Sequence, residues 1–199
     1  MLRNKTIASP SGGRWFWPAW GAAFLGFPIG GAVATPLVGP VESVGAALIA
    51  GAIAGGVIGA AQWLVLRRRI PLSALWVPAT AGGMALDMAL GQVLLGHDTS
   101  LQPLLLRALV VGAAIGAAQA VLLRGALPIA TMWAAVVTLG WPLAWAVSVA
   151  IGLDLTWNWA VFGASGALIF QLVTGLTLFL LLRRNAPVLV PVPAAASVV

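Results

Sequence analysis

The chain has no cysteine, one histidine and very few charges. Charged residues make up 7% of its 199 residues. The absence of cysteine excludes disulfides, thiolate metal sites and cysteine nucleophiles. His97 alone cannot form a multi-histidine metal cluster, although it is a conventional axial ligand for a haem. We therefore expect no cofactor and no metal.

Charge is too scarce here to cover a surface that faces water. A soluble domain carries about 25% charged residues, whereas hydrophobic residues make up 61% of this chain. Runs of about 20 apolar residues are long enough to span a bilayer as helices. Six such runs predict an all-α polytopic membrane protein with six transmembrane helices. They are residues 15–38, 44–66, 72–95, 101–123, 127–153 and 157–182.

The six segments form three similar pairs. Gly-Ala-Ala-Gln at 59–62 recurs 57 positions later at 116–119, and Gly26, Gly83 and Gly140 keep the same spacing. A repeat of this length holds two spanning helices, so we expect three helical hairpins, the third being the least similar. The expected divisions are a tail at 1–14, hairpins at about 15–69, 70–126 and 127–184, and a Pro/Ala/Val-rich tail at 185–199.

Positive charge alternates along the predicted spans. The basic residues outside the spans lie before the first, between the second and third, between the fourth and fifth, and after the sixth. The opposite connections hold acidic residues and His97. Cytoplasmic loops carry an excess of Lys and Arg, so we expect both termini on the cytoplasmic side. This arrangement accounts for the net charge of +6, and no nucleic-acid partner is expected.

Tryptophans gather near the ends of the predicted spans. Amphipathic indole rings favour the membrane–water interface, so we interpret these residues as anchors, with a ligand cage as the alternative. Trp141 and Trp145 lie deeper and would face lipid or another helix. The anchors are Trp15, Trp17, Trp20, Trp63, Trp76 and Trp133 at the inner interface, and Trp157 and Trp159 at the outer one.

Small residues recur every four positions within the spans. Helices in lipid associate through close backbone approach, which small residues permit, so these stripes predict helix contacts, or alternatively an oligomer interface. Pro28 and Pro142 occupy equivalent positions and should kink their helices. The glycines assigned to packing are Gly51, Gly55, Gly59, Gly112, Gly116, Gly26, Gly30 and Gly140.

Glutamines are the main neutral polar side chains at repeated positions. Gln62 and Gln119 each lie five residues before an arginine. A buried amide needs a partner, so we predict hydrogen bonds between helices, with substrate contact as the alternative. Gln171 is assigned the same role as a polar helix contact.

Asp87 and Arg107 are the ionisable residues that lie well inside predicted spans. At 1.5 Å per residue both sit roughly 10 Å below the outer boundary, in one hairpin. A lone charge costs on the order of 3 kcal/mol at mid-membrane, so we predict an ion pair, structural or coupling. In the alternative, Arg107 reaches the outer headgroups and Asp87 is protonated or hydrated. Asp87 could also couple to protons or ions.

Two resemblances accompany these patterns. Gly163-Ala164-Ser165-Gly166 resembles the Gly-x-Ser-Gly of rhomboid intramembrane proteases, but no histidine follows Ser165 to activate it, so we expect no enzyme. The motif Gly-x-x-x-Gly-x-x-Gln-Trp-Leu-x-Leu-Arg at 55–67 resembles uncharacterised bacterial multi-pass proteins built from the same hairpin, over most of 15–184. That resemblance implies an architecture and no activity.

We therefore expect a non-enzymatic, multi-pass protein of the bacterial inner membrane, in contact with the lipid bilayer. It would be an accessory or scaffold subunit beside another membrane protein, or a homo-oligomer. The alternative is a small transporter or channel, because internal repeats are common in transporters. Its pathway candidates would be Asp87, Arg107, Gln92, Gln171 and Thr174.

Overall fold

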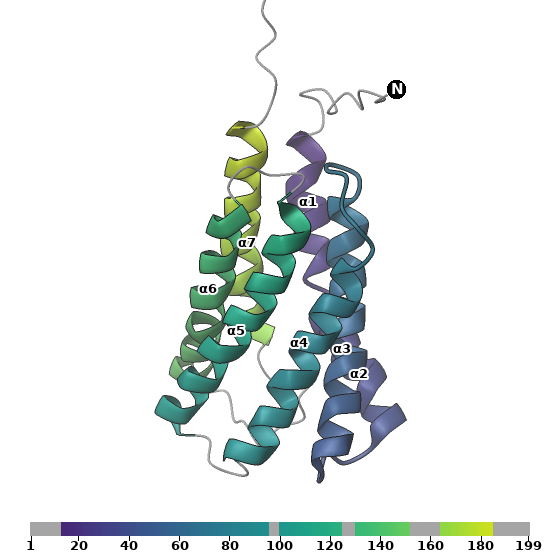
Figure 1. The fold of residues 1–199 in the computed structure, drawn as a ribbon, viewed down its shortest axis with the longest axis vertical. Helices are drawn as coiled ribbons and strands as arrows, with labels where there is room; N and C mark the ends of the chain where they lie inside the picture. Colours follow the sequence, from purple (N-terminus) through teal and green to yellow (C-terminus); the bar gives the residue numbers. More distant parts are fainter. Residues whose placement is uncertain (1–12, 96–99, 125–129, 152–163, 185–199) are drawn as a thin grey trace, which may run out of the picture.

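The protein is a bundle of helices that run side by side along its long axis (Figure 1). A computed structural model describes residues 13–95, 100–124, 130–151 and 164–184. Helices and the short turns between them account for this part of the chain, which confirms the all-α prediction. The elements are α1 (Gly13–Ala23), α2 (Gly26–Val38), α3 (Val44–Leu66), α4 (Trp76–Leu90), the π-helical turn η2 (Gly91–Leu95), α5 (Leu101–Leu123), α6 (Ala130–Ala150) and α7 (Ala164–Arg184).

Five helical stretches of the described chain are long and apolar enough to cross a membrane. They are α1 with α2 as one stretch, α3, α5, α6 and most of α7. The remaining helix, α4, has 15 residues and continues into the five residues of η2. These lengths define a multi-pass membrane protein.

Helix ends match the sequence expectation best where the apolar runs have clear boundaries. α3 and α5 begin and end at the predicted residues. The third segment was expected from residue 72, but α4 begins at Trp76, because residues 67–75 form a hydrogen-bonded turn. The start of the sixth segment, 157–163, lies outside the described residues.

The first segment is two helices, α1 and α2, with a break at Phe24 and Leu25. Pro28 has no N–H to donate to the carbonyl of Phe24, four residues earlier. Phe27 N donates to Phe24 O instead, over 3.0 Å, and Leu25 N donates to Ala22 O, over 3.0 Å. Pro142 lies inside α6, which continues through it without a comparable break.

The helices close into a ring. α2 packs on α3, α3 on α4, α4 on α5, α5 on α6, and α6 on α7, while α7 returns to contact α1 and α2. α6 and α7 therefore lie on one side of the bundle in Figure 1, and α2 and α3 on the other. The ring joins the first and last helices directly.

The interior is built around large aromatic side chains. Trp20, Trp76 and Trp133 are 1%, 0% and 1% exposed. The prediction that these three anchor the protein at the interface is therefore wrong, because each indole is enclosed by helices. Trp15, at 74% exposed, does face outward. Trp141 packs edge-on against Phe170 with ring centroids 4.9 Å apart.

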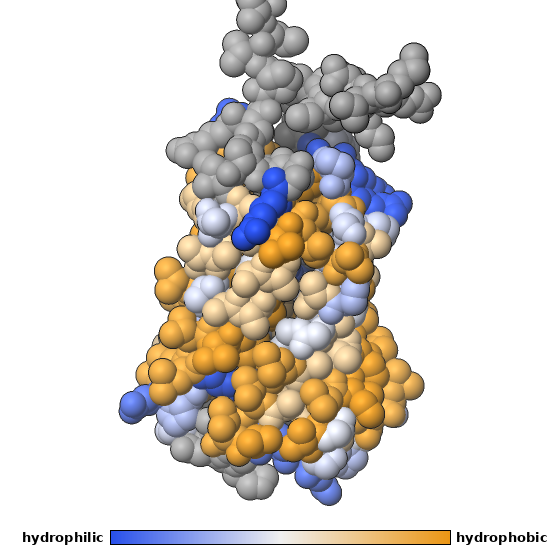
Figure 2. Space-filling model, in the orientation of Figure 1, coloured by the Kyte–Doolittle hydropathy of each residue, from blue (hydrophilic) through white to orange (hydrophobic). Residues whose placement is uncertain are grey.

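The sides of the bundle are apolar. Large aliphatic side chains point outward from the helices, such as Leu37 and Leu139, which are 69% and 65% exposed. Figure 2 shows apolar residues over the side of the molecule and hydrophilic residues mainly towards its two ends. A soluble monomer rarely exposes so much contiguous apolar surface, so this surface fits a lipid environment.

Candidate functional site

The structure brings Asp87 and Arg107 together between two adjacent helices. Asp87 lies in the last turn of α4, and Arg107 lies in the second turn of α5. Arg107 Nε is 3.0 Å from Asp87 Oδ1, and the two side chains are 12% and 5% exposed. A buried pair of opposite charges costs far less than either charge alone. Asp87 and Arg107 thus form a buried ion pair within the described bundle.

Two further residues enclose the guanidinium of Arg107. The ring of Trp145, on α6, lies 5.3 Å from Arg107 Cζ, within the range of a cation–π contact. A Cβ added to Gly91, the first residue of η2, would collide with Arg107 Nη1, so glycine leaves room for the charge there. The site therefore draws on α4, η2, α5 and α6.

The contact of the ion pair joins one nitrogen of Arg107 to one oxygen of Asp87. Nε and Oδ1 are within contact distance, yet neither atom has a hydrogen-bond partner with good geometry among the described residues. Hydrogen bonds normally offset much of the cost of burying a pair.

A helix irregularity follows directly on the pair. η2 is a π-helical turn that starts four residues after Asp87. Such turns occur mostly as local bulges, often at functional sites. This irregularity and the buried charges occupy the same end of α4.

A second polar cluster connects four helices, towards the end of the bundle at which α3 and α5 end. Trp133 Nε1 donates to Gln119 Oε1 over 3.0 Å, and Gln119 Nε2 donates to Thr80 Oγ1 over 2.9 Å. Trp76 Nε1 donates to Gln62 Oε1 over 3.3 Å, and the Thr80 hydroxyl donates to Trp76 O over 2.9 Å. Gln62 and Gln119 therefore bond across helices, at their predicted positions.

The sequence interpretation missed the partners of these glutamines. Trp76 and Trp133 are 57 positions apart, the same spacing as Gln62 and Gln119. That shared spacing could have predicted the pairing. When a tryptophan and a glutamine both recur at the same interval, a contact between them in one copy is expected to recur in the next.

Gln171 joins the last helix to the first. Its Nε2 donates to Trp20 O over 2.7 Å, and Trp20 Nε1 donates to Gln171 O over 2.8 Å. Trp20 O is free to accept because Phe24 N bonds to Gly21 O at the break before α2. Gly175 lies one turn along α7, where a Cβ would be 2.5 Å from Trp20 Cδ1. A proline-induced break and a glycine thus make room for the α1–α7 contact.

Two other buried polar atoms have no hydrogen-bond partner in the described part of the chain. They are Gln171 Oε1 and Trp141 Nε1. Burial of an unpaired polar group is costly.

The glycine stripe of α3 lies against α4. A Cβ at Gly55 would be 2.6 Å from Met84 Cβ, and one at Gly59 would be 2.9 Å from Thr80 Cβ. Gly51 is closer still, against the Met84 carbonyl. Larger side chains at these positions would push α3 and α4 apart.

The glycines of α5 make the corresponding contact with α6. A Cβ at Gly112 would be 2.9 Å from Trp141 Cβ, and one at Gly116 would be 3.1 Å from Ala134 Cα. The α3–α4 and α5–α6 contacts both join neighbouring members of the three expected hairpins.

Other assigned glycines pack within an expected hairpin. A Cβ at Gly26 would be 3.1 Å from Ile58 Cα, and one at Gly30 would be 2.8 Å from Ala54 O, both on α3. A Cβ at Gly140 would be 3.2 Å from the Phe170 ring on α7. The glycines of this set therefore line helix contacts inside the molecule.

The pathway candidates fall into separate groups. Thr174 Oγ1 donates to Phe170 O over 2.7 Å, and Gln171 is bonded to Trp20. The described hydrogen bonds do not connect these α7 residues with Asp87 and Arg107. Gln92 lies in η2 and is partly exposed.

The serine motif of α7 has one member whose packing is described. A Cβ at Gly166 would be 2.6 Å from Ser148 Oγ and 2.7 Å from the carbonyl carbon of Ala144, both on α6. That glycine serves close helix packing. Gly163, the Ser165 side chain, His97 and Asp98 lie outside the described residues. Within the described ranges, no three His, Cys, Asp or Glu side chains gather as a metal site would require.

Comparison with family models, with curated proteins and with solved structures gives no match to this chain. By its fold and its site, the protein is a multi-pass helical membrane protein with a buried ion pair.

Proposed function

We propose that the chain is a non-enzymatic protein of the bacterial inner membrane, acting as an accessory or scaffold subunit of a membrane complex or as a homo-oligomer. The observation that carries this proposal is the use of the interior polar groups. Gln62, Thr80 and Gln119 bond to residues of neighbouring helices, and Gln171 bonds to Trp20. These polar side chains hold the helices to one another. Their use in contacts between helices supports a structural role in the membrane.

The proposal includes six spans arranged as three repeated hairpins, with α4 and η2 together forming the third span. Contacts that recur with a spacing of 57 residues support it. Gly26 lies against Ile58 and Gly83 against Ile115. The Trp76–Gln62 bond likewise has its counterpart 57 positions later.

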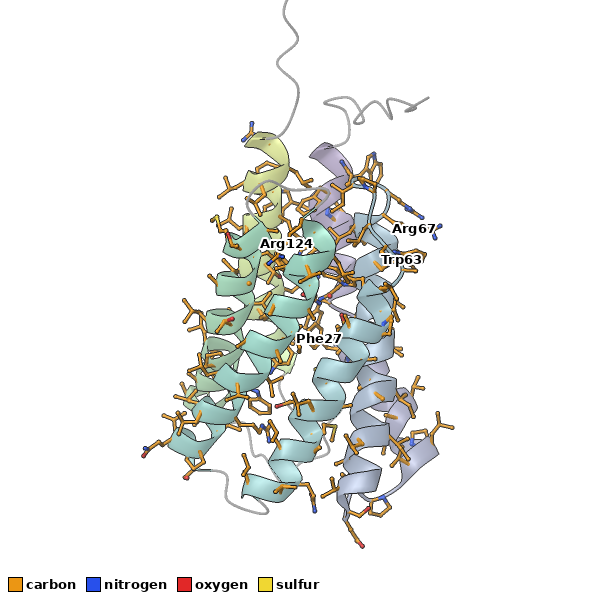
Figure 3. The ribbon with its side chains drawn as sticks, in the orientation of Figure 1. Phe27, Trp63, Arg67 and Arg124 are labelled. Atoms are coloured by element: carbon orange, nitrogen blue, oxygen red, sulfur yellow. The ribbon has the colours of Figure 1, made fainter. Side chains whose placement is uncertain are left out.

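Both termini would be cytoplasmic in this arrangement. Arg67 and Arg124 lie towards the same end of the bundle, as Figure 3 shows. Glu42 lies just before the start of α3, and Arg67 follows the end of α3, so the two residues lie at opposite ends of that helix. This charge asymmetry supports the orientation by the positive-inside rule.

Outward-facing glycines support a partner within the membrane. A Cβ at Gly56 on α3 or at Gly82 on α4 would meet nothing within 4 Å. Packing inside the bundle does not require glycine there. In lipid, small residues on an outer face permit close approach by another helix.

Purification in mild detergent at native expression level tests this function. We expect a stoichiometric partner by mass spectrometry, or a dimer or larger oligomer by light scattering. The variant Gly56→Leu/Gly82→Leu should lose that partner, whereas the matched variant Ala113→Leu/Ala117→Leu, on the exposed face of α5, should keep it. A colourless monomer that elutes alone contradicts the proposal.

A transporter or channel is the second candidate, and the Asp87–Arg107 pair favours it. Buried ionisable residues in membrane proteins often mark ion or proton pathways. In vesicles with an internal pH dye, proton or ion flux that Asp87→Asn abolishes would establish this function instead.

A further inference from the structure

The connection between α3 and α4 begins with three consecutive arginines. We call residues 67–75 the basic turn. Arg67 and Arg68 are exposed and Arg69 is partly buried. Neither the ion pair nor the glutamine network uses these residues.

The backbone of the basic turn is fixed by hydrogen bonds. Arg69 N donates to Leu66 O over 2.8 Å, and Leu72 N donates to Ile70 O over 2.8 Å. Ile70 and Leu72 are 7% and 8% exposed and pack in the core. The arginines therefore project from a folded segment.

Trp63 fixes the direction of one arginine. Its Nε1 donates to Leu72 O over 3.3 Å, which holds the indole across the basic turn. Arg67 Cζ lies 4.4 Å from the centre of that ring. Figure 3 shows both side chains at the outer edge of the bundle. The guanidinium of Arg67 is thus positioned before any ligand arrives.

Among the described residues, no carboxylate lies near the three arginines of the basic turn to neutralise their charges. The two described carboxylates are Asp87, which pairs with Arg107, and Glu42. Glu42 precedes α3, whose 23 residues place it about 35 Å from the basic turn at 1.5 Å per residue. The described part of the bundle therefore supplies no counter-charge for the three arginines.

The position of the basic turn indicates the source of that counter-charge. It lies at the end of the apolar side of the bundle, where hydrophilic residues appear in Figure 2. Leu64, just before it on α3, is 46% exposed. Apolar surface next to an arginine cluster matches a lipid, with acyl chains along the helices and the phosphate at the arginines.

We propose that the basic turn binds the headgroup phosphate of anionic phospholipids. Arg67, stacked on Trp63, provides the fixed contact, and Arg68 and Arg69 add charge around it. A lipid with a net negative headgroup is bound in preference to a zwitterionic one, since the arginines neutralise its charge.

Lipid selectivity in vesicles tests this site directly. The full chain is reconstituted in phosphatidylcholine with trace spin-labelled phosphatidylglycerol or phosphatidylcholine, and the immobilised fraction of each is measured. We expect a several-fold preference for phosphatidylglycerol, since each basic residue near a membrane surface contributes about 1 kcal/mol, roughly fivefold. Arg67→Gln/Arg68→Gln/Arg69→Gln should remove most of that preference.

Two further variants separate a built site from a diffuse positive field. Arg124→Gln/Arg183→Gln removes two other exposed arginines and should change the preference much less. Trp63→Phe keeps an aromatic ring but loses the bond to Leu72, and it should lower the preference partly. An unchanged preference in the triple variant, or an equal loss in the Arg124/Arg183 variant, would overturn the proposal. Gel filtration and helical circular dichroism establish that each variant is folded.

Discussion

The indole of Trp133, on α6, donates a hydrogen bond to the side chain of Gln119, on α5, over 3.0 Å. Trp76 makes the same bond to Gln62, 57 positions earlier. An indole N–H buried among apolar groups is costly unless it is bonded. The glutamines therefore allow these tryptophans to lie inside the bundle, where they are among the largest fully buried side chains.

Replacing Gln119 by leucine should destabilise the protein. The variant keeps the volume but leaves Trp133 Nε1 and Thr80 without their Gln119 partner. We expect a loss of about 1 to 3 kcal/mol in the free energy of unfolding, the usual cost of an unsatisfied buried polar group. Unfolding by sodium dodecyl sulfate in mixed micelles measures it.

Gln102→Leu is the matched control, because Gln102 is exposed on the same helix. It should change stability by less than about 0.5 kcal/mol. Equal effects of the two substitutions would mean that the Gln119 bonds contribute no net stability.

Two adjacent glycines on α3 should differ sharply in how well they tolerate substitution by alanine. A Cβ at Gly55 would be 2.8 Å from Ala81 Cα, a backbone atom that cannot move alone, whereas a Cβ at Gly56 would meet nothing within 4 Å. Gly55→Ala should therefore cost about 1 to 3 kcal/mol through overpacking. Gly56→Ala should be neutral or slightly stabilising, because alanine is the better helix former. A neutral Gly55→Ala would show that α3 and α4 are not in close contact.

Helix extents and helix contacts were largely readable from the sequence. The bounds of α3 and α5 follow from apolar runs that end at charged or turn-forming residues, such as Arg67. The pairing of Asp87 with Arg107 could be predicted from the sequence, because isolated charges in apolar helices are rare and costly. The glycine stripes identified contact faces, since glycine spacing marks a face directly.

Other features depend on partners that a single segment does not reveal. Trp20, Trp76 and Trp133 have the interfacial preference of every indole, and only the fold supplies the acceptors that bring them inside. Pro28 breaks its helix whereas α6 continues through Pro142, although the local sequences are alike. The local sequence around each proline therefore does not distinguish the two outcomes.

The ion pair predicts a strong coupling between two substitutions. Asp87→Asn or Arg107→Gln alone leaves one buried charge unpaired and should cost about 3 to 5 kcal/mol. The double variant removes both charges and should be more stable than either single variant. Folded yield and detergent-induced unfolding of the four proteins give the coupling energy by a double-mutant cycle. If the two losses simply add, the charges do not stabilise one another.

Closure of the ring should depend on Gly175 but not on Gly21. A Cβ at Gly175 would be 2.8 Å from Trp20 Nε1, so Gly175→Ala should displace the indole and weaken its bond to Gln171 O. We expect a loss of about 1 to 3 kcal/mol, with faster amide hydrogen exchange in α1 while α4 and α5 keep their protection. Gly21 lies on α1 with open space around it, and Gly21→Ala should leave exchange unchanged or slower. Unaltered exchange in α1 of Gly175→Ala would mean that the contact between the first and last helices does not hold α1 in place.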